Sequence, residues 1–230
     1  MSTADTAGIV ENERTAGPRS RKGIRTRARL LDAAKLVFEE DGFLAARISD
    51  IAERAGLSHG SFYHYFDTKE EIFHEVVNAL YDRLRAPLHT VIFVHSSHTP
   101  PAERIREGNR IFLESYRSEA RLIRVIEQVS RYDESFDRRR YEEQLPYDRQ
   151  LVDSLRTLQA RGQADPTVDV EVAAPALVAM MNRFAEMWLV QGYVDLDLEH
   201  GVDELTRIWV NALGLKQEPA AARRSNSRAK

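Results

Sequence analysis

The sequence predicts an all-α protein with a small N-terminal unit of three helices and a larger helical unit after it. Three observations lead to this prediction. Apolar residues recur at the i, i+3 and i+4 positions along most of the 230 residues, which is the spacing of helices that bury one face. No stretch of any length alternates as a strand does. Residues 47–70 have the pattern of two short helices joined by a tight turn.

The composition allows a substantial core and limits the possible classes of site. Hydrophobic residues make up 43% of the chain, and cysteine is absent, which excludes disulfides and thiolate metal sites. Residues 1–18 lack the apolar segment of a signal peptide, and the uncharged run Ala86–Pro101 is broken by proline, histidine and serine. His89, His95 and His98 fit no standard ligand spacing. We therefore expect a cytoplasmic protein with no cofactor, no metal and no membrane partner.

The net charge of −3 is unevenly distributed. Residues 14–70 carry 11 basic and 8 acidic residues, whereas residues 71–215 carry 17 basic and 24 acidic ones. The segment from Arg19 to Arg29 holds six basic residues and no acidic one. A basic segment on an acidic body suits contact with phosphates, although a solvated tail would show the same run of charge.

The first helix is predicted from about Arg21 to Glu40, and Gly42 is expected to end it in a left-handed conformation with Phe43 returning to the core. Five apolar residues at helical spacing form its expected buried stripe: Ile24, Ala28, Leu31, Ala34 and Phe38.

A second helix is predicted over about Ile48–Ala55, followed by a turn at Gly56 and a third helix over about Ser58–Phe66. Gly56 suits the turn because glycine alone takes a positive φ without strain, and Ser58 can cap the third helix. The apolar residues that let the two helices share a core are Ile51, Ala55, Leu57 and Phe62.

The third helix is rich in groups that can form hydrogen bonds, which is typical of a helix that enters the major groove of DNA. Helical hairpins with a glycine turn are common, and most bind nothing. Here the core and turn positions are in register and a polar, aromatic helix follows, so DNA binding is favoured. The residues concerned are His59, Gly60, Ser61, Tyr63, His64 and Tyr65.

The run DIAERAGLSHGSFYHYFDTKEEIF, with LLDAAKLVFEEDGF before it, closely resembles the DNA-binding domain of TetR-family transcriptional regulators over residues 24–73. The resemblance implies an all-helical fold, in which three DNA-binding helices precede a larger domain that binds an effector and dimerises. The expected divisions are a disordered tail over 1–18, a helix-turn-helix domain over 19–66, an effector-binding and dimerisation domain over 67–215, and a disordered basic tail over 216–230.

The resemblance also implies roles for individual residues. His59, Gly60 and Ser61 match positions that contact base edges, after the cap Ser58. Phosphate contacts are expected from Tyr63, His64, Tyr65 and Lys69, unless one of the two tyrosines packs inward.

Arg47 stands where the family usually has a threonine cap, and arginine cannot cap a helix. Either Ser49 caps a shortened helix, or water satisfies the helix end, and Arg47 is then available for a phosphate.

The fourth helix is expected to open with a capping box, formed by Asp67 with Glu70 or by Thr68 with Glu71. Its apolar stripe continues past Pro87, which predicts a kinked helix extending to about Val94. The remaining chain is predicted to form helices over about 102–117, 119–132, 135–160, 169–191 and 202–213.

The resemblance implies a cavity between the helices of the larger domain and a dimer interface on the last two. Methionine and aromatic residues suit an apolar pocket, although ordinary core packing explains any single one of them equally well. The expected pocket residues are Phe112, Tyr116, Phe136, Met180, Phe184, Met187 and Trp188. The expected interface residues, about half of which burial within one chain would also explain, are Leu177, Met181, Leu189, Leu205, Ile208 and Trp209.

The resemblance, together with these patterns, implies a homodimeric repressor that binds a near-palindromic double-stranded DNA operator. A small apolar or amphipathic effector, such as an acyl or sterol-like molecule, would relieve the binding. One alternative is a DNA-binding regulator whose larger domain binds a protein partner. A helical enzyme is the remote alternative, because no nucleophile–base pair, metal spacing or phosphate loop is present.

Overall fold

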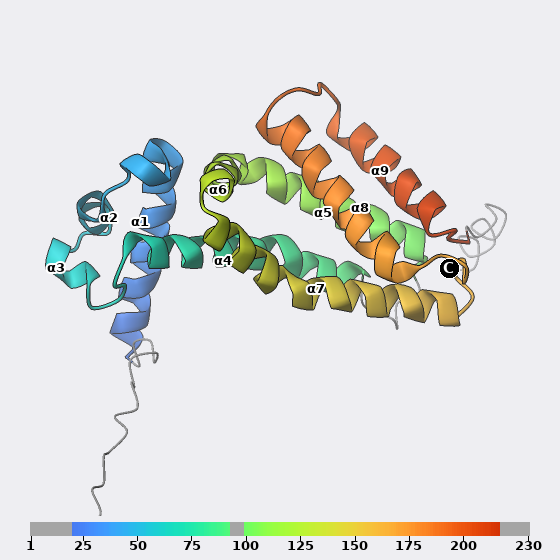
Figure 1. Cartoon of the computed structure of the whole chain (residues 1–230), viewed down its shortest axis with the longest axis horizontal. Coiled ribbons are helices and arrows are strands. Elements are labelled where there is room, and N and C mark those ends of the chain that lie inside the picture. Colours follow the sequence, from blue (N-terminus) through green and yellow to red (C-terminus); the bar gives the residue numbers. More distant parts are fainter. Residues whose placement is uncertain (1–19, 93–98, 217–230) are drawn as a thin grey trace, which may run out of the picture. The chain divides into compact units, whose positions relative to one another are not determined.

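The structure is a computed structural model that describes residues 20–92 and 99–216, with the side chains of 86–92 excluded. The described part is helical and contains no strand (Figure 1), which confirms the predicted fold class. The expected tail over 1–18, the expected tail over 216–230 apart from Lys216, and the side chains of His89, His95 and His98 lie outside the described residues. No helix in the described ranges has the length and apolar character needed to cross a membrane.

The chain divides into two compact units, with the boundary between Val76 and Val77. This boundary comes ten residues later than residue 66, the expected end of the DNA-binding domain. The first two turns of α4 (Lys69–Ile92) belong to the first unit, because Phe73 packs against Phe38 and Phe43 with ring centroids 4.9 and 4.7 Å apart. The rest of α4 belongs to the second unit.

In the first unit, α1 (Arg21–Ala45) is followed by α2 (Ile48–Arg54) and α3 (His59–Phe62). Ser20 caps α1 by accepting a hydrogen bond from the Gly23 amide at 3.1 Å. Gly42 has a φ of 73° and interrupts the regular helix, as the sequence predicts, although its ψ of 169° is extended rather than helical.

The buried face of α1 differs from the expected stripe. The buried residues are Leu30, Ala33, Ala34, Val37 and Phe38, whereas Ile24 is 58% exposed and Ala28 is exposed. Between these two positions Arg27 pairs with Glu75 of α4, and its guanidinium lies 4.8 Å from the centre of the Phe66 ring. Near the start of α1, the basic side chain of Arg27 therefore makes the contact with α4, whereas the apolar pattern predicted that Ile24 and Ala28 would be buried.

The second unit contains the rest of α4 and five further helices, three of which begin at an aspartate cap: Asp133, Asp169 and Asp197. The last helix begins four residues before the predicted Val202, because Asp197 accepts a hydrogen bond from the His200 amide. The elements are α5 (Pro101–Ser118), α6 (Ala120–Tyr132), α7 (Glu134–Ala160), α8 (Val170–Ala185), the π-helical turn η1 (Glu186–Val190) and α9 (Leu198–Ala212).

Within this unit α5 pairs with α9, which is distant in sequence, and α7 pairs with α8, the next helix along the chain (Figure 1). A buried hydrogen bond of 3.0 Å from Asn109 Nδ2 to Thr206 Oγ1 links α5 to α9. At the surface Arg106 pairs with Asp203 at 2.6 Å. These polar contacts set the position of α9 along α5, and so place the side chain of Trp209.

Candidate functional site

The α3 helix presents a polar surface that is held in place by buried aromatic rings. Phe62 and Phe66 are 0% and 1% exposed, and they anchor the segment to the core of the first unit. His59, Gly60, Tyr63 and His64 are exposed on the other side. Ser61 and Tyr65 are partly exposed, so neither tyrosine is buried. The surface predicted to contact DNA is therefore open to a partner.

The α3 helix is shorter than predicted. Ser58 caps it as expected, accepting a hydrogen bond from the Ser61 amide at 3.2 Å. The regular helix ends at Phe62, and a turn follows in which the Tyr65 amide donates to the Phe62 carbonyl at 2.9 Å. Tyr63 and His64 therefore project from a turn rather than from a helix.

The connection between α2 and α3 requires glycine. Gly56 has a φ of 65°, as predicted, and a Cβ atom placed there would lie 2.8 Å from Arg29 Nη2. That guanidinium donates a hydrogen bond to the Ala55 carbonyl, so it fastens the end of α2 to α1. The turn thus fixes α3 relative to the body of the first unit.

Arg47 stands before α2 in an extended conformation, with φ −116° and ψ 145°, and its side chain is exposed and caps nothing. The helix begins directly after it at Ile48, so Ser49 does not cap a shortened helix. Instead Ser49 Oγ donates to Asp50 Oδ1 at 3.0 Å. Arg47 is consequently available for a phosphate.

Lys69 is used differently from the expected phosphate contact. Its ammonium donates hydrogen bonds to the carbonyl oxygens of Phe43, Leu44 and Ala46 at 2.7, 3.3 and 3.0 Å. An ammonium group has three donors, and here each has an acceptor. The ammonium also lies 4.7 Å from the centre of the Phe43 ring. Lys69 therefore holds the C-terminal end of α1 against the start of α4.

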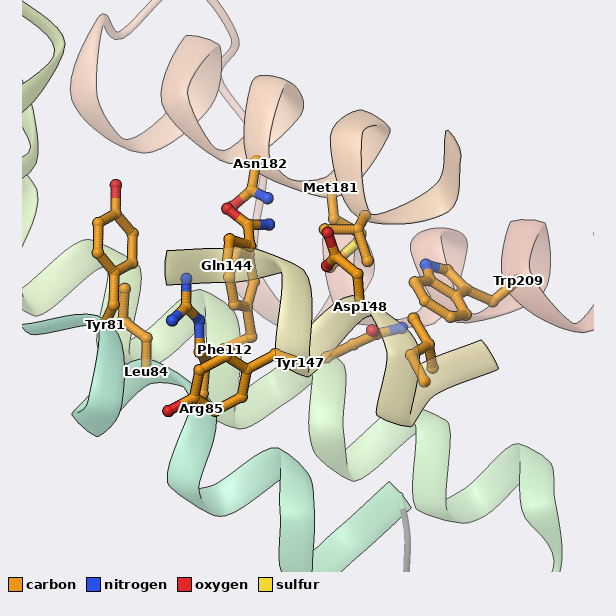
Figure 2. Close-up of a pocket in the computed structure, with 13 residues that line it drawn as sticks. Tyr81, Leu84, Arg85, Phe112, Gln144, Tyr147, Asp148, Met181, Asn182 and Trp209 are labelled. Atoms are coloured by element: carbon orange, nitrogen blue, oxygen red, sulfur yellow. The ribbon is translucent and has the colours of Figure 1, made fainter. Parts of the chain in front are cut away.

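The second unit contains a cavity of about 120 Å³ that is lined by residues of five helices (Figure 2). This volume counts the positions open to the centre of a water molecule, and each buried water needs roughly 10–15 Å³ of it. The cavity therefore has room for about ten waters, which in the liquid would fill about 300 Å³. This is the lower end of the range for small-molecule sites. The lining residues are Tyr81, Leu84 and Arg85 of α4, Asn109 and Phe112 of α5, Gln144, Tyr147, Asp148 and Leu151 of α7, Val178, Met181 and Asn182 of α8, and Trp209 of α9.

Two charged side chains line this largely apolar space. The guanidinium of Arg85 lies 4.3 Å from the centre of the Tyr147 ring and 4.9 Å from that of Tyr81. Burial raises the pKa of Asp148, and the Gln144 hydrogen bond and the charge of Arg85 only partly oppose this effect. Trp209 is 5% exposed, and its indole N–H has no hydrogen-bond partner among the described residues.

Some of the residues expected in the dimer interface line the cavity, and several of those expected in the pocket do not. Met181 and Trp209 were expected at the dimer interface, but they line the cavity. Phe112 was expected in the pocket and does line it. Residues 178, 181 and 182 share one face of α8, and at 100° per residue Met180 points away from that face. Phe184 lies near the edge of the face, three residues after Met181, and Met187 belongs to η1. Met180, Phe184 and Met187 do not line the cavity and are partly exposed.

The other expected residues also have different surroundings. Tyr116, Phe136 and Trp188 are buried outside the cavity, and the Trp188 ring fills the space that a side chain on Gly201 would need. Of the remaining expected interface residues, Leu177 and Leu205 are buried in the chain, Leu189 is partly exposed and Ile208 is 44% exposed.

Sequence reasoning missed the cavity residues of α4 and α7. Tyr81, Leu84 and Arg85 follow one another at helical spacing, and so do Gln144, Tyr147, Asp148 and Leu151. The polar residues among them do not belong to an apolar stripe, so periodicity did not identify them. A charged residue on the buried face of a helix, such as Arg85 or Asp148, is the signal that could have indicated a binding site on both helices. In the described part of the chain no group of three or more histidine, aspartate or glutamate residues could hold a metal ion.

Comparisons with known proteins match both units. Residues 30–76 match the model of bacterial regulatory proteins of the tetR family, and residues 96–197 match a tetracyclin repressor-like C-terminal domain. The HTH-type transcriptional regulator YdgC of Bacillus subtilis is 28% identical over 184 residues, which cover 76% of this chain and 86% of YdgC. The regulator EthR of Mycolicibacterium smegmatis is 25% identical over 213 residues, covering 93% of this chain and 96% of EthR.

A solved structure of a TetR-family regulator from Mesorhizobium loti has the same fold. It superposes with a TM-score of 0.69 at 21% identity, covering 84% of this chain and 98% of the other. The two matched domains occupy the N-terminal and C-terminal parts of the sequence in the order that the fold shows. The chain belongs to the TetR family of transcriptional regulators.

Proposed function

We propose that this chain is a ligand-responsive transcriptional repressor that releases its operator when a small apolar or amphipathic molecule occupies the cavity of the second unit. The observation that carries the proposal is the mainly apolar cavity in a chain that also presents an exposed α3 surface. A cavity within one unit favours a small molecule over a protein partner, which would need an open surface.

The α4 helix provides a route for coupling. Its first turns pack in the DNA-binding unit, where Lys69 holds the end of α1. Further along the same helix, Tyr81, Leu84 and Arg85 line the cavity. A ligand that favours one position of α4 would change the population of the DNA-binding conformation by the difference in its affinity for the two states.

A homodimer supplies the two α3 surfaces that a near-palindromic operator requires. We propose the outer faces of α8 and α9 as the interface. Val172 and Ile208 are 63% and 44% exposed there, and the partly exposed Met180 points away from the cavity face of α8. The substitution Ile208→Glu should reduce dimerisation in sedimentation experiments and weaken operator binding in parallel.

Selection of binding sites from random DNA, followed by footprinting, tests the DNA-binding part of the proposal. A dimer should protect two half-sites that lie about 10 bp apart, or a multiple of this spacing. Val178→Phe, which fills the cavity, should retain operator binding and lose the response to ligand. A single half-site protected by a monomer, or a full ligand response in Val178→Phe, would contradict the proposal.

A further inference from the structure

The cavity contains hydrogen-bond donors that have no acceptor. Arg85 carries five N–H donors, and among the described residues it forms no ion pair and no hydrogen bond, only the two contacts with tyrosine rings. In Figure 2 its guanidinium extends from α4 toward the labelled side chains of α7 and α8. The buried indole N–H of Trp209 likewise lacks an acceptor in the described part of the chain.

The unpaired groups indicate what kind of ligand the cavity accepts. The Trp209 N–H is buried without a partner, and such donors are normally satisfied by the protein, water or a ligand. Arg85 is partly exposed, so its unpaired guanidinium lines the cavity without being cut off from water. A carboxylate offers two acceptor oxygens in the plane that a guanidinium fork matches. The two rings that flank Arg85 hold its guanidinium in place, which reduces the entropy lost when an anion binds.

The remaining lining suits an apolar chain. Leu84, Leu151 and Trp209 are buried, and they belong to three different helices. Trp209 enters from α9 on the opposite side of the cavity from Arg85 in Figure 2, and Asp148 lies between the two in this view. A ligand with one acidic end and an apolar body matches this distribution.

Asp148 is the feature that would favour a cationic ligand instead. Its carboxylate already has a hydrogen bond from Gln144 and the charge of Arg85 nearby. A cationic ligand would have to enter the same space as the Arg85 guanidinium and would be repelled by it. An anionic ligand gains the unpaired guanidinium, whose positive charge also lies close enough to Asp148 to offset part of the repulsion from that carboxylate.

We infer that the effector is a small apolar carboxylic acid, whose carboxylate pairs with Arg85 and whose chain lies along the apolar lining toward Trp209. This inference deepens the proposed function and rests on it, since it specifies the ligand class of the same cavity. Binding of the ligand can be measured without DNA, so the two claims can fail separately.

The test compares decanoate, decanol and decylamine, which have the same chain and different head groups. Their binding is measured by titration calorimetry in the absence of DNA. In a Trp188→Phe background, the fluorescence of Trp209 reports whether the cavity is the site. Decanoate should bind at least tenfold more tightly than decanol, and decylamine should bind most weakly.

Variants of two arginines on α4 provide the matched comparison. Arg85→Gln should reduce the affinity for decanoate to that for decanol, and Arg85→Lys should restore part of the preference. Arg83→Gln removes the same charge from an exposed side chain that pairs with Glu119 at 3.4 Å, outside the cavity, and should leave the affinity for decanoate unchanged. Asp148→Asn should strengthen decanoate binding.

Several results would overturn the inference. They are equal or tighter binding of decanol or decylamine, equal effects of Arg85→Gln and Arg83→Gln, and no binding of any of the three compounds. If decanoate binds through Arg85 but leaves operator affinity unchanged, the ligand class stands and the proposed regulatory function fails.

Discussion

Lys69→Ala is expected to lower the stability of the protein without removing a phosphate contact. In the structure the ammonium donates to three carbonyl oxygens at the end of α1, so the substitution leaves these acceptors without a partner. Loss of hydrogen bonds to a charged group costs about 1.5–3 kcal/mol. Because water can reach the partly exposed site, we expect the lower part of this range, about 2 kcal/mol, or a decrease in Tm of about 4–8 °C for a chain of this length.

The assay combines thermal unfolding with operator binding at several salt concentrations. A lysine that contacts a phosphate reduces the dependence of log Kd on log salt by about one charge per subunit when it is replaced. We expect Lys69→Ala to leave this slope unchanged while affinity falls for every DNA sequence.

Lys69→Arg is the control that keeps the charge. The planar guanidinium cannot direct three donors at the same convergent carbonyls, so it should destabilise the protein almost as much as alanine does. A wild-type Tm in Lys69→Ala, together with a reduced salt slope and full rescue of DNA binding by arginine, would refute the structural role of Lys69.

Three further predictions concern the turn, the readout surface and the cavity. Gly56→Ala should destabilise the protein by about 1–2 kcal/mol in chemical denaturation, because alanine is strained at a positive φ. Gly60→Ala is the control, since a Cβ atom at residue 60 meets open space, and it should not destabilise the protein. Equal effects of the two substitutions would contradict this view of the turn. His59→Ala and Ser61→Ala should change base preference by about 1–3 kcal/mol at particular positions of an operator panel, and a uniform loss on all sequences would exclude a readout role. Because burial raises the pKa of Asp148, the folded state binds that proton more tightly than the unfolded state, and stability decreases as pH rises through the folded pKa. Asp148→Asn should therefore raise Tm at about pH 7 and have less effect at about pH 3, and a lower Tm at pH 7 would contradict the shift.

The features that sequence reasoning predicted correctly depend on neighbouring residues in the chain. The cap at Ser58, the positive φ of Gly56 and the bounds of most helices follow from local chemistry that the sequence displays directly. The resemblance that identified the family is of the same kind, since it rests on one continuous segment.

The features that sequence reasoning missed depend on tertiary contacts. The α8 helix is apolar on both faces, so periodicity could not show that Met181 faces the cavity while Met180 faces outward. Similarly, Lys69 is an isolated basic residue in the sequence, and only the fold brings it to the carbonyl of Phe43, 26 residues away. Arg85 and Asp148 belong to helices far apart in sequence, and no local pattern predicted that they share a cavity.

The most direct test of the account is the reciprocity of operator and ligand binding. Operator affinity is measured with and without saturating ligand, and ligand affinity is measured with and without saturating operator. If the cavity controls the α3 surface, each partner weakens the other by the same factor, which we expect to be at least about tenfold, or 1.4 kcal/mol. A ligand that occupies the cavity with the same affinity whether or not the operator is bound would contradict the account.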